Sequence, residues 1–400
     1  MTSTEASHVR RNAQILSVAQ ALGGASPAII ISLGGLVGQA LASRPALTTV
    51  PISLFHLGLA LGTIPAAMLM RRHGRRAGYL LGATLGLLGG VVAAYGIWVS
   101  SFLLFCAGTA LAGLYASYVQ SYRFAVIDGV APERRARAIS WIMTAGLFAA
   151  VIGTQAVIWT RDALPAAPFA GSFLSQAVLA LLAIAVLSRL RPMPVAVADP
   201  QHGSGRPLGQ IARQPRFIVA VVAGMVSYGL MSLVMTAAPI AMVGCGHTVG
   251  EAALGIQWHV LAMYMPSFFT GRLIERFGKA RITGLGLLLT ASAAAVALSG
   301  LSIAHFWGML VLLGLGWNFG FIGATALLTD CYRAEERTRA QALNDFLVFG
   351  SVAVASFSSG RLLTVSGWDT INQLVYPIVA VVLALLLWQR LAWHKAKAKA

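Results

Sequence analysis

Apolar residues dominate the chain in long stretches, and short segments between these stretches hold most of the charges. Each stretch reaches or approaches the roughly 20 residues that an α-helix needs to cross the hydrocarbon core of a bilayer. The pattern therefore predicts an all-α membrane protein. Its twelve predicted spans lie near residues 13–41, 47–70, 77–99, 101–123, 138–160, 168–189, 217–243, 249–270, 281–300, 303–328, 338–360 and 371–393.

Composition supports a membrane protein and argues against several other classes. Hydrophobic residues make up 58% of the chain and charged residues 10%, whereas soluble domains have about 25% charged residues. The net charge of +17 does not indicate a nucleic-acid partner, because the basic residues lie in short loops. The first apolar stretch is too long for a signal peptide, so we expect a retained helix. The sequence shows no nucleophile–base pair and no nucleotide-binding loop, so no feature of it suggests an enzyme.

The distribution of basic residues predicts the orientation in the lipid bilayer. If the N-terminus is cytoplasmic, all Lys and Arg residues except Arg44, Arg161 and Arg361 fall in or beside cytoplasmic loops. Loops on the cytoplasmic side of membrane proteins carry an excess of Lys and Arg. We therefore expect a multi-pass protein of the bacterial inner membrane, with both termini in the cytoplasm.

The two halves of the chain repeat one another. The segment DGVAPERRARA from Asp128 aligns with DCYRAEERTRA from Asp330. This repeat predicts two six-helix bundles, 1–189 and 216–400, joined by a cytoplasmic linker over 190–215. Two related halves of this kind are typical of secondary transporters, which bind their substrate near the bilayer midplane and move it by alternating access.

A loop motif links the chain to a known family. The segment GRLIERFGKAR, which begins at Gly271, resembles the gating-loop motif of the major facilitator superfamily. The resemblance implies a fold of twelve helices with both termini cytoplasmic. The first-half copy departs from the motif, because Arg71 stands where the family usually has Asp. The gating-loop residues in the second half are Gly271, Glu275, Arg276, Gly278 and Lys279.

Methionine and histidine recur in the seventh and eighth predicted spans. Met231 and Met235 lie one helical turn apart, as do His259 and Met263, so each pair shares a helix face. At 1.5 Å per residue, Met235 and His259 both lie roughly 12–14 Å from the outer surface. Thioether and imidazole ligands together favour a soft cation, and Cu(I) is the best match. Methionine is also an ordinary packing residue, so a purely structural role remains the alternative.

These paired motifs, Met231-x-x-x-Met235 and His259-x-x-x-Met263, resemble those of the CcoA-like copper importers. The resemblance implies that these four residues bind copper and that the metal supplies cytochrome c oxidase assembly. It also implies a cytoplasmic copper chaperone as a candidate partner. Copper is then the transported ligand, and no cofactor is permanently bound.

Other residues are candidates for supporting roles. Met242, Cys245 and His247 lie at the predicted outer mouth and are candidates for receiving the metal. His56 occupies the place in the first half that His259 has in the second, so it is a candidate ligand from the opposite half. Asp345 is an acid within a predicted span and a candidate for proton coupling.

Two other functions are compatible with the same residues. The chain could import a small organic solute such as riboflavin, or export a drug in exchange for protons; the methionines would then form the apolar wall of a pocket. It could also be a copper-binding membrane sensor that transports nothing. Replacing Met235 by Leu distinguishes the solute transporter, because this change removes the sulfur and preserves the volume.

Overall fold

The computed structural model describes residues 3–126, 132–191 and 205–397. Asp128 of the predicted repeat and half of the predicted linker lie outside these ranges. The helices of the first half are α1 (Ser3–Gly23), α2 (Ala25–Leu41), η1 (Pro45–Leu47), α3 (Val50–His73), α4 (Arg75–Trp98), α5 (Phe102–Ala125), α6 (Pro132–Thr160) and α7 (Ala170–Leu187). Those that follow are α8 (Leu208–Ala212), α9 (Pro215–Gly244), α10 (Val249–Tyr264), α11 (Ser267–Phe277), α12 (Lys279–Ser299), α13 (Ile303–Leu328), η2 (Ala334–Glu336), α14 (Arg337–Gln373) and α15 (Val375–Lys397).

Each of the twelve predicted spans coincides with one or two of these helices. Nine helices in the described part are long and apolar enough to cross a membrane, and two shorter apolar segments, Thr144–Thr160 and Val375–Leu391, accompany them. Breaks within predicted spans have local causes. α10 and α11 are separated at Pro266, which cannot donate a backbone hydrogen bond. Between the last two predicted spans, α14 is interrupted at Gly367, whose φ of 81° is not helical.

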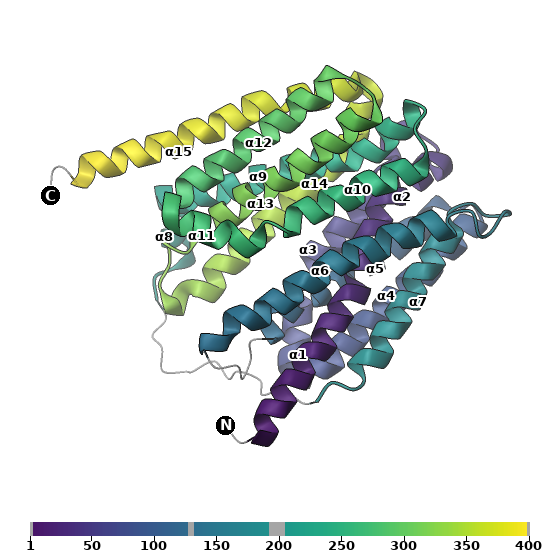
Figure 1. Cartoon of the computed structure of the whole chain (residues 1–400), viewed down its shortest axis with the longest axis horizontal. Helices are drawn as coiled ribbons and strands as arrows, with labels where there is room; N and C mark the ends of the chain where they lie inside the picture. The colour runs from purple at the N-terminus through teal and green to yellow at the C-terminus, as the bar shows by residue number, and fades with distance from the viewer. Residues whose placement is uncertain (1–2, 127–131, 192–204, 398–400) are drawn as a thin grey trace.

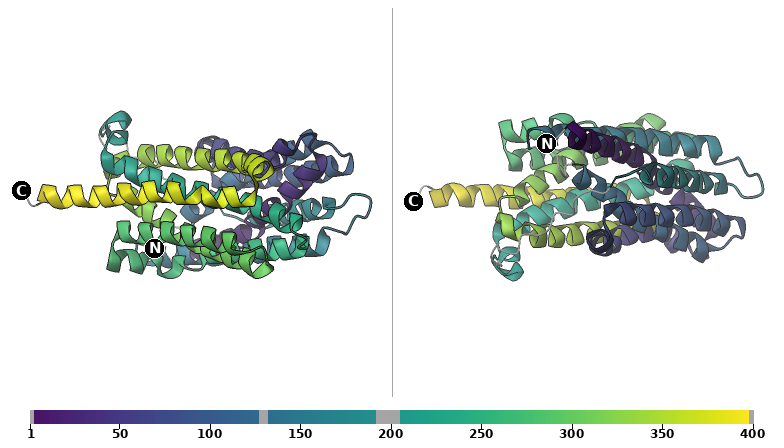
Figure 2. Two further views of the ribbon diagram at one scale, coloured as in Figure 1. Left: turned by 90° about the horizontal axis from the view of Figure 1, so that it is seen from above. Right: turned by 90° about the horizontal axis from the view of Figure 1, so that it is seen from below.

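The helices form two groups that lie side by side (Figure 1). α1–α7 make one group and α9–α15 the other, and the long axes of most helices run in a common direction (Figure 2). Close packing within each group depends on small residues. A side chain at Gly113 of α5 would collide with the carbonyl oxygen of Phe55 in α3, and one at Gly286 of α12 with the backbone of Gly320 in α13.

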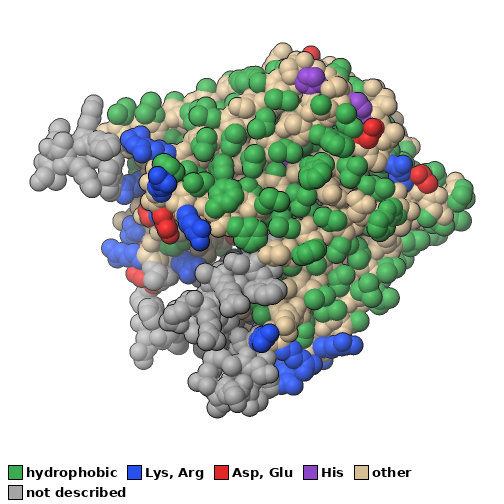
Figure 3. Space-filling view, in the orientation of Figure 1, with side chains coloured by type: hydrophobic (Ala, Val, Ile, Leu, Met, Phe, Trp, Pro, Cys, Tyr) green, Lys and Arg blue, Asp and Glu red, His purple; other side chains and the backbone are tan. Residues whose placement is uncertain are grey.

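Charge is concentrated at one end of the molecule. On the face shown in Figure 3, hydrophobic side chains cover the middle of both helix groups, and most Lys and Arg gather along the edge near the chain termini. We call this end the inner end. The opposite end, which carries η1 and the α9–α10 connection, is called the outer end.

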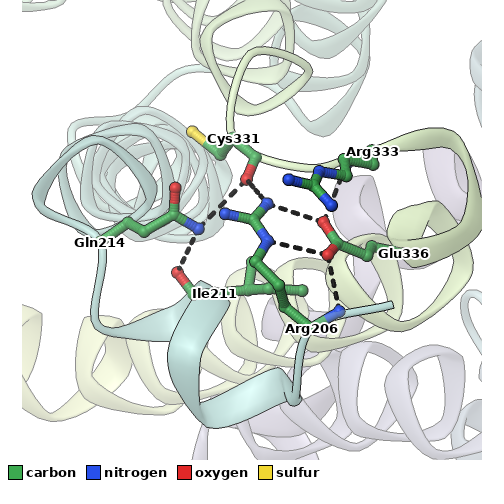
Figure 4. A network of polar contacts seen from close by, with 6 residues as sticks. All are labelled: Arg206, Ile211, Gln214, Cys331, Arg333 and Glu336. Carbon is green, nitrogen blue, oxygen red and sulfur yellow. Dashed lines mark hydrogen bonds and ion pairs between the residues drawn. The ribbon is translucent and has the colours of Figure 1, made fainter. Parts of the chain in front are cut away.

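A network of polar contacts attaches the segment before α8 to the second helix group (Figure 4). Arg206 donates from Nε and Nη2 to the carboxylate of Glu336, over 2.8 and 2.7 Å. The backbone N–H groups of Arg206 and Arg333 donate to the same carboxylate. Glu336 is fully buried, so Arg206 neutralises a charge that has no access to water.

Candidate functional site

A cavity lies between the two helix groups. Its walls come from α1, α2, α3, α5 and α6 on one side and from α9 and α10 on the other. The space between them amounts to about 910 Å³, including the part that is continuous with solvent. The lining residues of α9 and α10 are Tyr228, Met231, Met235, Val260, Met263 and Tyr264.

The cavity lining is uncharged. No Asp, Glu, Lys or Arg is found among the described residues that line it. Its polar side chains in the first helix group are Gln20 on α1, His56 on α3 and Gln120 on α5. An apolar cavity with a few convergent polar groups is typical of a site for a small organic molecule. An ionic ligand would find no opposite charge on these walls.

Aromatic rings form the wall that α9 and α10 contribute. Tyr228 packs edge-on against Trp317, with ring centroids 5.3 Å apart, and also contacts Phe321 and Phe349. Tyr264 lies 6.1 Å from Trp317, and Trp317 stacks on Phe321 at 5.2 Å. Such pairs hold one another rigidly. Tyr228 and Tyr264 therefore present a fixed aromatic surface to the cavity.

The four predicted copper ligands are not all on the cavity wall. Met231, Met235 and Met263 line the cavity, whereas His259 does not. The ring of His259 is fully buried, and its Nδ1 donates to the carbonyl oxygen of Leu310 in α13 over 2.7 Å. Its Nε2 has no hydrogen-bond partner in the described chain. His259 thus joins α10 to α13 within the second helix group.

The residues predicted at the outer mouth differ in their surroundings. Met242 is fully buried, while Cys245 is exposed. His247 is hydrogen-bonded through Nε2 to the carbonyl oxygen of Leu301 over 2.8 Å, and its ring packs edge-on against Phe306. Within the described ranges, no group of three or more His, Cys, Asp or Glu side chains could hold a metal ion.

His56 and Asp345 occupy different positions relative to the cavity. His56 lines it, is only 6% exposed, and has no hydrogen-bond partner for Nδ1 among the described residues. Asp345 lies near the inner end of α14, where Asn344 donates to its Oδ1 over 3.1 Å. The charge of Arg123, at the inner end of α5, also acts on Asp345.

The gating-loop residues surround the turn between α11 and α12. Gly278 has a φ of 90°, and Gly74 at the corresponding turn between α3 and α4 has a φ of 84°. Glycine adopts such angles without strain. Lys279 forms an ion pair with Asp330, 2.6 Å away, and Arg276 lies over the ring of Phe277. Of the other two residues, Gly271 is on α11 with open space beside it, and Glu275 is also on α11.

Contacts between the two helix groups lie towards the outer end. Gln257 of α10 accepts hydrogen bonds from Thr154 and Gln155 of α6, over 2.6 and 3.2 Å. Between α3 and α14, Thr49 accepts from the backbone N–H of Gly360 over 3.2 Å. These contacts join the two helix groups at the outer end.

Several residues that shape the cavity are not predicted from the sequence. Ionisable residues and methionines within the spans are the predicted candidates, and Gln20, Gln120 and the aromatic group around Tyr228 are not among them. Amide side chains within apolar spans were an available signal, because a buried polar group needs a partner. The aromatic rings of α9, α10, α13 and α14 come together only through tertiary packing, so no sequence pattern indicates that they meet.

Comparison with known proteins identifies relatives along the whole chain. Residues 15–263 and 220–400 match the Major Facilitator Superfamily. The chain is 63% identical over 386 residues to the riboflavin transporter RfnT of Brucella anthropi, covering 96% of this chain and 97% of that protein. It is 31% identical to the uncharacterized MFS-type transporter YdeG of Bacillus subtilis, over 97% of this chain and 93% of that protein. The fold is similar to that of the nucleoside transporter NupG, with a TM-score of 0.72 at 12% identity, covering 94% and 99% of the two chains.

The similarity to RfnT overturns the prediction of copper transport. A protein 63% identical over nearly the whole length is named as a riboflavin transporter, so copper as transported ligand, copper import and the copper chaperone are wrong predictions. The ligand roles given to Met231, Met235, His259 and Met263 rested on copper and lose their basis with it. Their helical spacing brings the three methionines to the wall of a cavity that has no charged residue among its described lining residues.

The match to the family and the fold agree on the class of protein. The resemblance inferred from the gating-loop motif is confirmed at the level of the superfamily, as is the all-helical fold. The chain is a multi-pass membrane transporter and not an enzyme. It belongs to the Major Facilitator Superfamily.

Proposed function

We propose that this chain imports riboflavin across the bacterial inner membrane. The observation that carries the proposal is the 63% identity to a riboflavin transporter over 96% of the chain. Riboflavin was among the organic solutes expected if the methionines only form a pocket wall. The same proposal takes the methionines as part of the substrate's surroundings.

The chemistry of the cavity supports a flavin. Riboflavin is uncharged at neutral pH, and its fused rings present a broad face, one polar edge and a chain of hydroxyl groups. The aromatic surface of Tyr228 and Tyr264 suits the face of such a ring system. Met231 and Met235 are polarisable and adapt to an irregular apolar outline. The absence of charged groups among the described lining residues avoids the cost of desolvating an ion.

The mode of transport is proposed from the contacts between the helix groups. We take 1–189 and 216–400 as the two moving bundles and 190–215 as the linker between them. We propose that the contacts of Gln257 and Thr49 hold the outer end closed and that the cavity then opens towards the inner end. Both termini are placed in the cytoplasm because Lys and Arg gather at that end. Rocking of the bundles about the cavity then exposes it to each side in turn.

Asp345 is proposed to couple transport to protons. It is the acid that α14 places near the cytoplasmic side of the interface, close enough to Arg123 of the other bundle for their charges to interact. An acid in such a place can change its protonation as the bundles separate. The gating-loop residues from Gly271 to Lys279 are proposed to hold the α11–α12 turn during this motion.

Growth of a riboflavin-requiring bacterium tests the proposal. A strain that can neither make nor import riboflavin should grow at low external riboflavin when it expresses this chain. The same strain with an empty vector should need far more riboflavin. Equal growth of the two strains, with the protein present in the membrane, would show that the chain does not import riboflavin.

A further inference from the structure

Two glutamines face the cavity from neighbouring helices at the same depth. Gly23 of α1 packs on Val119 of α5, because a side chain at Gly23 would meet Val119 at 2.9 Å. Gln20 lies one turn from Gly23 towards the inner end, and Gln120 is adjacent to Val119. Both line the cavity and both are half-buried.

No other described residue is hydrogen-bonded to the side chain of Gln20 or Gln120. By contrast, Gln257 at the outer end accepts two hydrogen bonds. A side-chain amide offers two N–H donors and a carbonyl acceptor. Two such groups facing a largely apolar cavity are therefore available to a ligand with matching donors and acceptors.

The glutamines lie opposite the aromatic surface. Tyr264 is the last residue of α10, which ends towards the inner end, and Tyr228 lies on the inner side of Met231 on α9. Gln120 likewise lies near the inner end of α5. The tyrosines are therefore at the same end of the cavity as the glutamines. The outer part of the cavity has a different character, because Met235 and Ile31 supply its walls.

We propose that Gln20 and Gln120 recognise the imide edge of the flavin ring, which carries an N–H donor between two carbonyl acceptors. This inference rests on the function proposed above. The ring lies against Tyr228 and Tyr264 with its imide edge towards the inner end of the cavity and its apolar end towards Met235. Hydrogen bonds of this kind discriminate strongly, because a ligand that lacks the matching group leaves buried polar atoms unpaired.

The test compares two substrates in transport assays. One is riboflavin, and the other is riboflavin methylated on the imide nitrogen, which has lost the N–H donor. The variants are Gln20→Leu and Gln120→Leu, which remove the amides at similar volume. Gln39→Leu is the matched control, because Gln39 lies at the outer end and lines a separate pocket. Gln120→Met provides an unbranched alternative if the leucine variant accumulates poorly in the membrane.

We expect the KM for riboflavin to rise about tenfold in each cavity variant, as for the loss of one well-formed hydrogen bond. Gln39→Leu should behave as the unaltered protein. The methylated flavin should be transported poorly by the unaltered protein, and the cavity variants should reduce its transport no further. An unchanged KM for riboflavin, or an equal loss for both substrates, would overturn the inference alone. If the unaltered protein fails to transport riboflavin, both the proposed function and this inference fall.

Discussion

At the scale of single residues, the methionines and His259 show where sequence patterns mislead. Helical spacing predicted that Met231 and Met235 share a face, and both do line the cavity. The same spacing placed His259 beside Met263, but spacing says nothing about where a side chain finds its partner. The Nδ1 of His259 donates a hydrogen bond to the carbonyl oxygen of Leu310 on α13, and this bond holds the ring within the second helix group.

Conservative replacement of Met235 should leave transport nearly intact. Met235→Leu keeps volume and hydrophobicity, so the KM for riboflavin should change by less than about fivefold. Added copper should have no effect on either protein. Uptake of radiolabelled riboflavin at several concentrations provides the measurement. A complete loss of uptake at normal expression would mean that the sulfur itself is required.

His259→Ala should act on stability instead of on substrate affinity. It removes a fully buried ring and its hydrogen bond to α13, at a cost of about 2–4 kcal/mol in the free energy of unfolding. Thermal unfolding of the purified protein in detergent should show a lower Tm. The KM of the protein that remains folded should match that of the unaltered chain; a raised KM at unchanged Tm would argue that His259 contacts the substrate.

At the scale of helices, closure of the outer end depends on few polar contacts. Gln257 on α10 binds Thr154 and Gln155 on α6, and α2 meets α9 where Gly35 packs against Ile240. Apolar contacts between separate bundles are readily exchanged for others. A hydrogen bond to a buried amide requires a defined geometry. The hydrogen bonds to Gln257 therefore favour the arrangement in which the outer end is closed.

Gln257→Leu should therefore loosen the outer end. Ile240→Cys, in a chain that also carries Cys245→Ser to remove the exposed thiol, reports on access to the α2–α9 contact. Labelling by a membrane-impermeant maleimide should be roughly five- to thirtyfold faster with Gln257→Leu, as expected for the loss of two hydrogen bonds of about 0.5–1 kcal/mol each. Gln210→Leu, a change to an exposed glutamine on α8, is the control and should label at the original rate. Equal labelling rates in all three proteins would mean that the hydrogen bonds of Gln257 do not control closure of the outer end.

The attachment of the segment before α8 should depend on pH. The guanidinium of Arg206 holds the pKa of Glu336 well below its usual range. A carboxylate with a lowered pKa stabilises the native state above its ordinary pKa of about 4.3, and this stabilisation is lost as the pH falls through the lowered value.

Arg206→Ala should accordingly lower the Tm at pH 7, and the difference from the unaltered chain should shrink as the medium is made strongly acidic. Arg213→Ala, a change to an exposed arginine after α8, should leave the Tm unchanged at either pH. Scanning fluorimetry across this pH range gives both values. A Tm difference independent of pH would show that the ion pair is not the stabilising feature.

At the scale of the whole molecule, the fold was predictable and the substrate was not. Apolar spans, the distribution of Lys and Arg, and the loop motif from Gly271 each reflect constraints that the bilayer imposes on every transporter of this architecture. The proposed substrate site instead depends on side chains from seven helices that meet at one cavity. The meeting of Gln20, Gln120 and Tyr228 follows only from the packing of helices distant in sequence.

The driving force also belongs to the whole molecule. If Asp345 carries the coupled proton, Asp345→Asn should abolish the stimulation of uptake by an inward proton gradient. Exchange of internal for external riboflavin should continue, because exchange needs no net proton movement. Asp369→Asn, at an exposed acid of the same helix, is the control. Gradient-driven uptake that survives in Asp345→Asn would exclude Asp345 as the coupling group.

The central claim is most directly tested by reconstituting the purified chain in liposomes and measuring uptake of radiolabelled riboflavin. We predict saturable uptake that excess unlabelled riboflavin suppresses and that Cu(I) leaves unchanged. Uptake no greater than in protein-free liposomes, from protein shown to be folded, would contradict the account.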